Sequence, residues 1–335
     1  MRGKTFVSLS KTGYDDEGRK FSLSQPFLWR EPRAERTNGP FERPTLNRRP
    51  HSTMDSSSSE LKINPEKMDF RAYSISWNLT KRCNLNCDHC YLDANFRSGF
   101  RADELSTDEC RRVIDQIAEI NPNAFLILTG GEPLLRPDIY DLIRHAAEKK
   151  FMVVVGTNGT RINKINAEKI KAAGAHGVGI SIDSMDAAKH NTFRGVPLAW
   201  ERSMEAFDVL NEVGVDFLVQ MSVSDMNYRE IPDVVAFAEK AGAIAFNLYF
   251  LICTGRGQGN TDISNAAYEE ALKLLYEQQM NYKGRLMINS KCAPQYKRVV
   301  YENDPDSVYT RTYSGGCPAG THYSRISPEG NLTPC

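Results

Sequence analysis

Three cysteines lie close together in the stretch Lys81-Arg82-Cys83-Asn84-Leu85-Asn86-Cys87-Asp88-His89-Cys90-Tyr91, with the spacing CxxxCxxC. The chain has 335 residues, and its N-terminus lacks the apolar run that directs secretion. In such a chain, crowded cysteines favour metal ligation in a reducing compartment over disulfide formation. We therefore predict a cytoplasmic protein with a metal centre at Cys83, Cys87 and Cys90.

The overall charge and hydropathy exclude two classes of partner. Lys and Arg together number 42, as do Asp and Glu, so the formal net charge is zero. A neutral chain has no electrostatic signature for nucleic acid or for an anionic membrane surface. The longest apolar runs, such as 125–128 and 152–155, are far shorter than the roughly 20 residues of a membrane span. We expect neither a nucleic-acid partner nor a membrane span.

The chain divides into three parts by composition and pattern. Residues 1–65 are rich in Arg, Ser, Pro and Gly without a sustained helix or strand period, which predicts a disordered extension. From 68 to 285, short apolar runs alternate with amphipathic stretches, which predicts βαβ units around a parallel sheet. Strands are expected at 73–79, 124–129, 152–156, 177–182, 216–222 and 245–250. Helices are expected at 107–120, 137–149, 167–173, 198–213, 229–241 and 265–279.

Six such units are fewer than the eight of a full barrel. The predicted fold class is therefore α/β, a partial (β/α)6 TIM-like barrel that is open on one side. A loop-rich segment beyond residue 285 would cover the mouth of the barrel. The three clustered cysteines follow the first expected strand, at the end where parallel barrels place their active sites.

Three thiolates suit a 4Fe–4S cluster, since they can bind three irons and leave the fourth open to a ligand. A structural zinc site needs four protein ligands. His89 is poorly placed to be the fourth, because Asp88 and Cys90 leave it little room to fold back. A zinc module and a non-enzymatic iron–sulfur electron carrier are the alternatives from other functional classes. A carrier would need no open iron and no large barrel.

Other expected strand ends carry groups suited to a ligand at the same mouth. The second strand ends in Thr-Gly-Gly-Glu-Pro at 129–133, where two glycines allow a close backbone approach. The third ends near Asn158 and the fourth at Ser181 and Asp183, whose polar groups suit a ribose or a carboxylate. Asn158 with Gly159 is also a common turn sequence.

The CxxxCxxC motif followed by the aromatic Tyr91, together with the Gly-Gly-Glu-Pro sequence, resembles the radical S-adenosylmethionine (SAM) superfamily. The resemblance implies that SAM chelates the open iron and that one electron from the cluster cleaves SAM to a 5′-deoxyadenosyl radical. It also implies a low-potential electron donor such as ferredoxin or flavodoxin. Arg194 matches an arginine that pairs with the SAM carboxylate in related enzymes, with a surface ion pair as its alternative role. The SAM-binding residues predicted are Tyr91, Gly130, Gly131, Glu132, Pro133, Asn158, Ser181, Asp183 and Arg194.

The C-terminal cysteines carry a second resemblance. Cys317 and Cys335 stand in the pattern C-x12-G-x4-C, which resembles the opening of a SPASM domain. Such domains hold auxiliary iron–sulfur clusters in a subset of radical SAM enzymes, so the resemblance implies an auxiliary 4Fe–4S cluster at Cys317 and Cys335, with Cys292 as an added ligand. The dense run of further cysteines is absent, and we expect residues 286–335 to be the start of a truncated SPASM-like domain.

Two stretches point to a narrower group. The lead-in Trp77-Asn78-Leu79-Thr80 and the sequence from Cys292 to Cys335 resemble radical SAM enzymes of the alternative haem pathway, and relatives that tailor the haem of dissimilatory nitrite reductase. The resemblance implies modification of side chains on an iron tetrapyrrole, such as oxidative decarboxylation of propionates. A tetrapyrrole is therefore the favoured substrate. A SPASM-type maturase acting on a peptide or protein is the alternative.

Overall fold

The structure is a computed structural model, and it divides the chain into two compact units, Met1–Phe70 and Arg71–Cys335. The described residues are four short strands near the N-terminus and the ranges 74–95, 103–258, 263–307 and 317–335. Within these ranges, no helix is both long enough and apolar enough to cross a bilayer.

The first unit contains two pairs of short antiparallel strands, in a segment where the sequence shows no strand period. They are β1 (Val7–Ser8) with β4 (Pro26–Phe27), and β2 (Lys11–Tyr14) with β3 (Lys20–Leu23). The remainder of residues 1–65 lies outside the described residues, so the disorder expected there stays a prediction.

The second unit is built on one curled sheet of nine strands, in the order β11-β10-β9-β8-β7-β6-β5-β12-β13. All neighbours are parallel except the pair β12 and β13. The strands are β5 (Ser74–Asn78), β6 (Phe125–Thr129), β7 (Met152–Thr157), β8 (Gly177–Ser181), β9 (Phe217–Val223), β10 (Ala245–Phe250), β11 (Met287–Lys291), β12 (Tyr323–Ile326) and β13 (Leu332–Thr333). The predicted partial α/β barrel is confirmed, and its six predicted strands are β5 to β10.

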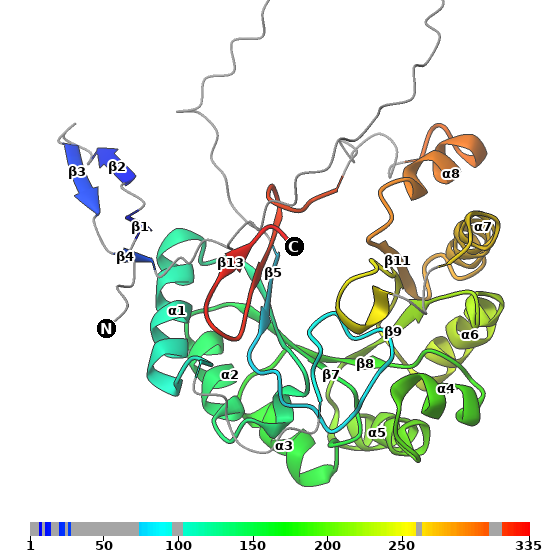
Figure 1. Cartoon of the computed structure of the whole chain (residues 1–335), viewed down its shortest axis with the longest axis horizontal. Helices are drawn as coiled ribbons and strands as arrows, with labels where there is room; N and C mark the ends of the chain where they lie inside the picture. Colours follow the sequence, from blue (N-terminus) through cyan, green and yellow to red (C-terminus); the bar gives the residue numbers. More distant parts are fainter. Residues whose placement is uncertain are drawn as a thin grey trace, which may run out of the picture. The chain divides into compact units, whose positions relative to one another are not determined.

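Helices connect successive strands and lie in an arc around the outside of the sheet (Figure 1). They are α1 (Thr107–Ile120), α2 (Ile139–Glu148), α3 (Lys164–Ala172), α4 (Ala187–Arg194), α5 (Ala199–Val213), α6 (Ile231–Ala241), α7 (Asn265–Asn281) and α8 (Tyr296–Asn303). Six were predicted, and α4 and α8 were not. The capping signals have the expected effect: Ser106 begins α1 in a capping box with Glu109, and Gly214 ends α5 in the left-handed conformation.

The sequence also missed three strands beyond residue 285. Strand β11 extends the sheet next to β10, and β12 pairs with β5 at the opposite side. The segment expected to be loop-rich therefore also contributes strands to the barrel sheet. Whether a separate SPASM-like domain begins at residue 286 stays a prediction.

The two faces of the sheet differ in chemistry, because side chains alternate between them along each strand. The face toward the helices carries buried apolar side chains, among them Trp77, Leu128 and Phe250, which form the main core. The strand register places a second set on the other, inner face. At its carboxyl end that face is polar, with Asn78 and Ser222 among its members. A polar inner face is typical of a ligand site and differs from a barrel packed with aliphatic side chains.

Candidate active site

The three clustered cysteines lie on the loop between β5 and α1, at the carboxyl end of β5. Cys83 and Cys87 are each 8% exposed. Backbone hydrogen bonds tie this loop to distant segments: the Cys83 amide donates to the Asn95 carbonyl at 2.9 Å, and the Asn86 amide donates to the Arg194 carbonyl at 3.0 Å. The amides of Leu85 and Ala94 approach the sulfurs of Cys83 and Cys90, each at 3.4 Å. The fold therefore holds the cysteine loop in one arrangement.

The glycines after β6 seat this loop. The Gly131 amide donates to the Thr80 carbonyl at 2.7 Å, and the Glu132 amide donates to the Arg82 carbonyl at 2.8 Å. A Cβ at position 131 would lie 2.2 Å from the Arg82 oxygen, and one at Gly130 would lie 2.6 Å from the Thr80 oxygen. The sequence pattern predicts that these glycines approach a ligand, and in the structure they also approach the backbone of the cysteine loop.

Glu132 is a fully buried carboxylate that joins the ends of two strands. It accepts hydrogen bonds from the Thr157 hydroxyl at 2.8 Å, the Asn158 amide at 2.9 Å and the Leu134 amide at 3.1 Å. Burial raises its pKa, although these hydrogen bonds act in the opposite direction. Pro133 follows it and begins a short 3-10 helix. Glu132 thus braces β6 against the end of β7.

Asn158 lies directly beside the cysteine loop. Its side-chain amide donates to Asn84 Oδ1 at 2.9 Å and lies 4.0 Å from the Cys83 sulfur. The Ser203 hydroxyl donates to the Asn158 carbonyl at 2.7 Å and fixes the turn from behind. A Cβ at Gly159 would lie 2.9 Å from the Ile180 side chain, so the Asn-Gly turn is also closely packed. Asn158 is therefore both a turn residue and a neighbour of the site.

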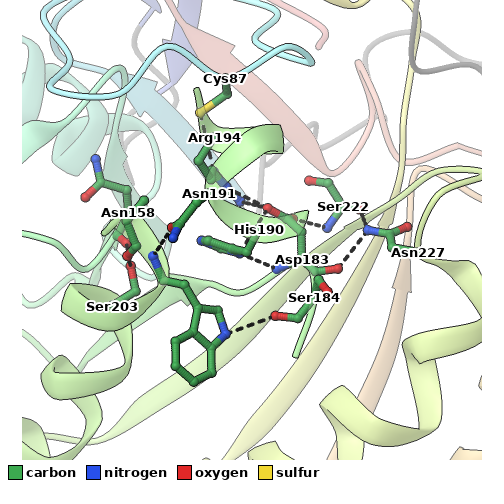
Figure 2. A network of polar contacts seen from close by, with 12 residues as sticks. Cys87, Asn158, Asp183, Ser184, His190, Asn191, Arg194, Ser203, Ser222 and Asn227 are labelled. Carbon is green, nitrogen blue, oxygen red and sulfur yellow. Dashed lines mark hydrogen bonds and ion pairs between the residues drawn. The ribbon is translucent and has the colours of Figure 1, made fainter. Parts of the chain in front are cut away.

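Asp183 and Arg194, which the sequence treated as separate ligand contacts, pair with each other (Figure 2). Arg194 Nε donates to Asp183 Oδ2 at 2.6 Å, and Arg194 Nη1 approaches the Cys87 sulfur at 3.8 Å. The Ser222 amide donates to Asp183 Oδ1 at 2.9 Å. The ion pair is buried. The alternative role considered for Arg194, an ion pair on the surface, is therefore wrong. The guanidinium links the carboxyl end of β8 to the cysteine loop.

This pairing sets the charges at the site. Burial by itself would raise the pKa of Asp183, but the adjacent Arg194 guanidinium holds that pKa below its usual value. Burial raises the pKa of Cys83 to about 12, and it raises that of Cys87 although Arg194 acts against the shift. Such thiols are protonated at neutral pH in the metal-free protein. Binding of iron would therefore release protons.

The remaining predicted contacts lie on or over the inner face. The Tyr91 hydroxyl donates to Asn78 Oδ1 at 2.8 Å, and the Arg325 guanidinium lies 4.4 Å from the centre of the Tyr91 ring. Ser181 ends β8 on the inner face and is half-buried. The structure thus brings the predicted residues to one end of the sheet, and their individual contacts with SAM remain predictions.

The C-terminal cysteines differ from the first group in exposure. Cys292, Cys317 and Cys335 are exposed as residues. Nevertheless, desolvation by surrounding protein raises the pKa of the Cys292 thiol, and the charges of Cys335, Arg325 and Cys317 act on it as well. That the three thiols hold one auxiliary cluster stays a prediction.

Two further residues, Gly255 and Arg256, contact the cysteine loop and were not predicted from the sequence. Arg256 Nε donates to the Cys87 carbonyl at 3.0 Å, and its Nη1 pairs with Asp93 at 2.8 Å. A Cβ at Gly255 would lie 2.5 Å from the Cys90 oxygen. Both belong to a short 3-10 helix after β10. The Gly-Arg-Gly sequence at 255–257 was the available signal, since glycine permits such close backbone contact.

The donor set fits an iron–sulfur cluster with an open iron better than it fits a single ion. Among the described residues, no three His, Cys, Asp or Glu side chains converge as the ligands of one metal ion would. In a 4Fe–4S cluster each thiolate binds a different iron, so its sulfurs stand farther apart than the ligands of one ion. His89 stacks on Phe193 at 4.3 Å between ring centres instead of turning toward the thiols.

Sequence comparisons agree with this site. The radical SAM superfamily profile matches residues 77–238. The chain is 38% identical over 269 residues to AdoMet-dependent heme synthase of Methanosarcina barkeri, which covers 78% of this chain and 76% of that protein. It is 31% identical to pre-heme d1 synthase of Dinoroseobacter shibae, over 78% of this chain and 67% of that protein.

Solved structures share the fold. The structure of Streptococcus suis SuiB bound to S-adenosylmethionine superposes with a TM-score of 0.63 at 19% sequence identity. The match covers 78% of this chain and 60% of the SuiB chain. At this identity the likeness concerns the fold alone.

Proposed function

The chain belongs to the radical SAM superfamily and is an enzyme that uses a 4Fe–4S cluster and SAM, and we propose that it modifies side chains of an iron tetrapyrrole in haem biosynthesis. The observation that carries the chemistry is the anchored set of buried Cys83 and Cys87 and half-buried Cys90 at the carboxyl end of a parallel sheet. The relatives named heme synthase and pre-heme d1 synthase support the choice of substrate.

Each of the three clustered cysteines would hold one iron. When bound, the cluster supplies the electron that cleaves SAM, and the resulting 5′-deoxyadenosyl radical removes a hydrogen atom from the substrate. The protein's part is to orient the groups and to exclude water. Arg194 donates from Nε to Asp183 and directs Nη1 toward the Cys87 sulfur, so its positive charge balances negative charge beside the cluster.

The contacts with SAM are proposed from the position of each residue. The backbone at Gly130, Gly131 and Glu132 lies next to the cysteine loop and would bind the amino group of SAM. Asn158, Ser181 and Asp183 follow neighbouring strands and would face its ribose and carboxylate. Tyr91 and Pro133 would complete the enclosure around the methionine part.

An auxiliary 4Fe–4S cluster held by Cys292, Cys317 and Cys335 is part of this proposal, and the influence of the Cys335 and Cys317 charges on the Cys292 thiol supports it. We also propose a low-potential electron donor such as ferredoxin or flavodoxin, and a cytoplasmic location. Both suit a cluster that must be reduced at low potential in the absence of oxygen.

A SPASM-type peptide maturase is the second candidate and is less well supported. The relative named for subtilosin biosynthesis in Bacillus subtilis is 28% identical, against 38% for the heme synthase of Methanosarcina barkeri. The peptide-modifying solved structures resemble the chain in fold alone. Membership of an enzyme superfamily also leaves little support for a non-enzymatic electron carrier or a zinc module.

The test is anaerobic reconstitution with iron and sulfide, reduction, and incubation with SAM and an iron porphyrin that carries propionate side chains. We expect 5′-deoxyadenosine and a porphyrin that has lost carbon dioxide. The triple variant Cys83→Ala/Cys87→Ala/Cys90→Ala should give neither product. Formation of 5′-deoxyadenosine without any change in the porphyrin, in a protein with full iron content, would refute the tetrapyrrole as substrate and leave the SAM chemistry intact.

A further inference from the structure

The inner face of the barrel sheet carries only two charged side chains among its described strand residues, and both are cations. They are Lys291, at the end of β11, and Arg325, in β12. The register pairs Lys291 with Tyr249 and Arg325 with Ser76, whose side chains point to the inner face. No carboxylate side chain lies on this face of the described strands. A surface lined in this way favours an anionic ligand.

Arg325 is half-buried and lacks a carboxylate partner among the described residues. Its Nη2 donates to the Tyr323 hydroxyl at 3.3 Å, and its guanidinium stacks over Tyr91. Its Nε is buried and has no hydrogen-bond partner in the described part of the chain. A buried donor without a partner costs free energy unless a ligand satisfies it. The planar fork of an arginine matches a carboxylate in geometry.

Lys291 resembles Arg325 in these respects. It is half-buried, and no hydrogen bond or ion pair joins its side chain to another described residue. By contrast, the charges of Asp183 and Arg256 each have a partner of opposite sign.

The two cations lie on strands that stand far apart in the sheet. Between β11 and β12 the order runs through six other strands, so the two cations flank the inner face from opposite sides of the sheet. The charges of Arg325 and Tyr91 act on the pKa of Tyr249, which is raised chiefly by burial. Tyr249 also accepts a hydrogen bond from Gln220 Nε2 at 3.5 Å. Tyrosines and cations therefore share the region beside the cysteine loop.

We propose that Lys291 and Arg325 bind carboxylate side chains of the substrate, and that Tyr91 and Tyr249 contact the flat ring system that carries them. The inference rests on the proposed function, because it names the groups of a tetrapyrrole that the site recognises. Held from two sides, the substrate would present one edge to the cysteine loop, and the pair would set which carboxylate side chain reaches the radical.

A different role for the same cations would be to balance the negative charge of a cluster at Cys292, Cys317 and Cys335. That role predicts loss of iron when either cation is removed. The carboxylate role predicts weaker binding of the acid form of the substrate, with iron content unchanged. The two roles can therefore be separated by measurement.

The experiment is a titration of the reconstituted full chain, with SAM present, by an iron porphyrin carrying propionates and by its methyl ester, followed by optical absorbance. We expect Arg325→Gln and Lys291→Gln each to weaken binding of the acid about tenfold or more, as is typical for loss of a charge-assisted hydrogen bond. Binding of the ester should change less than about twofold. Arg325→Lys should fall between, since it keeps the charge and loses the fork.

Lys283→Gln is the matched control, because Lys283 is exposed and precedes β11 at its amino end. It should leave both affinities unchanged. Equal weakening of acid and ester in Arg325→Gln and Lys291→Gln, no weakening of either, or loss of iron would each overturn the carboxylate role. If the wild type cleaves SAM but binds neither porphyrin, the proposed function fails together with the inference. If it binds both equally well and the variants do too, the inference alone fails.

Discussion

The two groups of cysteines differ in how firmly the fold holds them. Cys83 and Cys87 are buried, and backbone hydrogen bonds from α4 and the turn after β6 fix their loop. Cys292 and Cys317 are exposed, and Cys292 has a backbone φ of +59°, in the left-handed region that a residue with a side chain seldom adopts. The fold therefore buries and anchors two cysteines of the first group, whereas the cysteines of the second group are exposed.

The contrast indicates a division of labour. A cluster that must bind SAM in one orientation needs ligands fixed in advance by the protein. A cluster that only accepts or passes electrons can tolerate ligands that order when iron binds, since metal binding itself contributes to folding. Three experiments can sharpen or break this comparison.

Single cysteine substitutions should give the largest difference. We expect Cys87→Ser to abolish formation of 5′-deoxyadenosine in the absence of substrate, because one iron of the SAM-binding cluster loses its ligand. Cys317→Ser should lower that activity less than about fivefold, because the SAM-binding cluster keeps its three thiolate ligands. Iron content and product are measured for both. Equal loss in the two variants would show that the groups depend on one another.

Gly131→Ala tests the anchoring of the first group. The added Cβ would meet the Arg82 carbonyl oxygen at 2.2 Å, so the cysteine loop must shift. Overpacking of this kind costs about 1–3 kcal/mol of stability. Because the strain lies at the cysteine loop, we expect the variant to lose most of its iron. Gly284→Ala is the control, since its Cβ meets nothing within 4 Å and only its φ of +80° resists substitution.

That control should cost about 1–2 kcal/mol of stability and leave the iron content unchanged. Thermal unfolding and iron analysis of both variants make the comparison. Retention of iron by Gly131→Ala would contradict the anchoring role.

Asp183→Asn gives a pH-dependent effect on stability. It leaves the buried Arg194 without its counter-ion, which costs about 3–5 kcal/mol. Because the folded-state pKa of Asp183 is lowered, its contribution is complete above the unfolded value of about 3.9 and is lost as pH falls from there through the folded value. The difference in unfolding free energy between wild type and variant should be constant from pH 8 to 5.

Below about pH 4 that difference should shrink. Urea denaturation at a series of pH values measures it. A gap that widens on acidification would contradict the assigned direction of the pKa shift.

Much of the fold could be predicted because the outer face of the sheet and the helices that cover it are periodic. Helix α1 was predicted with the bounds that the structure shows, from its capping box and its amphipathic pattern. Helix α4 was missed because it has only eight residues and several polar ones, and its burial of His190 and Arg194 depends on tertiary contacts. Strand β12 has the sequence Tyr-Ser-Arg-Ile, and its Tyr323 and Arg325 lie on the inner face. It therefore lacks the run of apolar residues that would have predicted a strand.

The site was predictable in its residues and less so in their partners. Spacing located the cysteine loop and the glycines after β6. It could not reveal that Arg194 reaches back to Asp183, eleven positions earlier, because that contact depends on where α4 lies. Nor could it show that Lys291 and Arg325 both face the inner side of the sheet, since that depends on how β11 and β12 pair with their neighbours.

The polar carboxyl end of the inner face affects when the enzyme can form a radical without side reactions. Water wets a polar concave surface whenever no ligand lies there. A carbon radical formed beside water and dissolved oxygen is lost to side reactions. The substrate itself then becomes a wall of the reaction chamber, and we expect electron delivery to be productive only after the substrate has closed it.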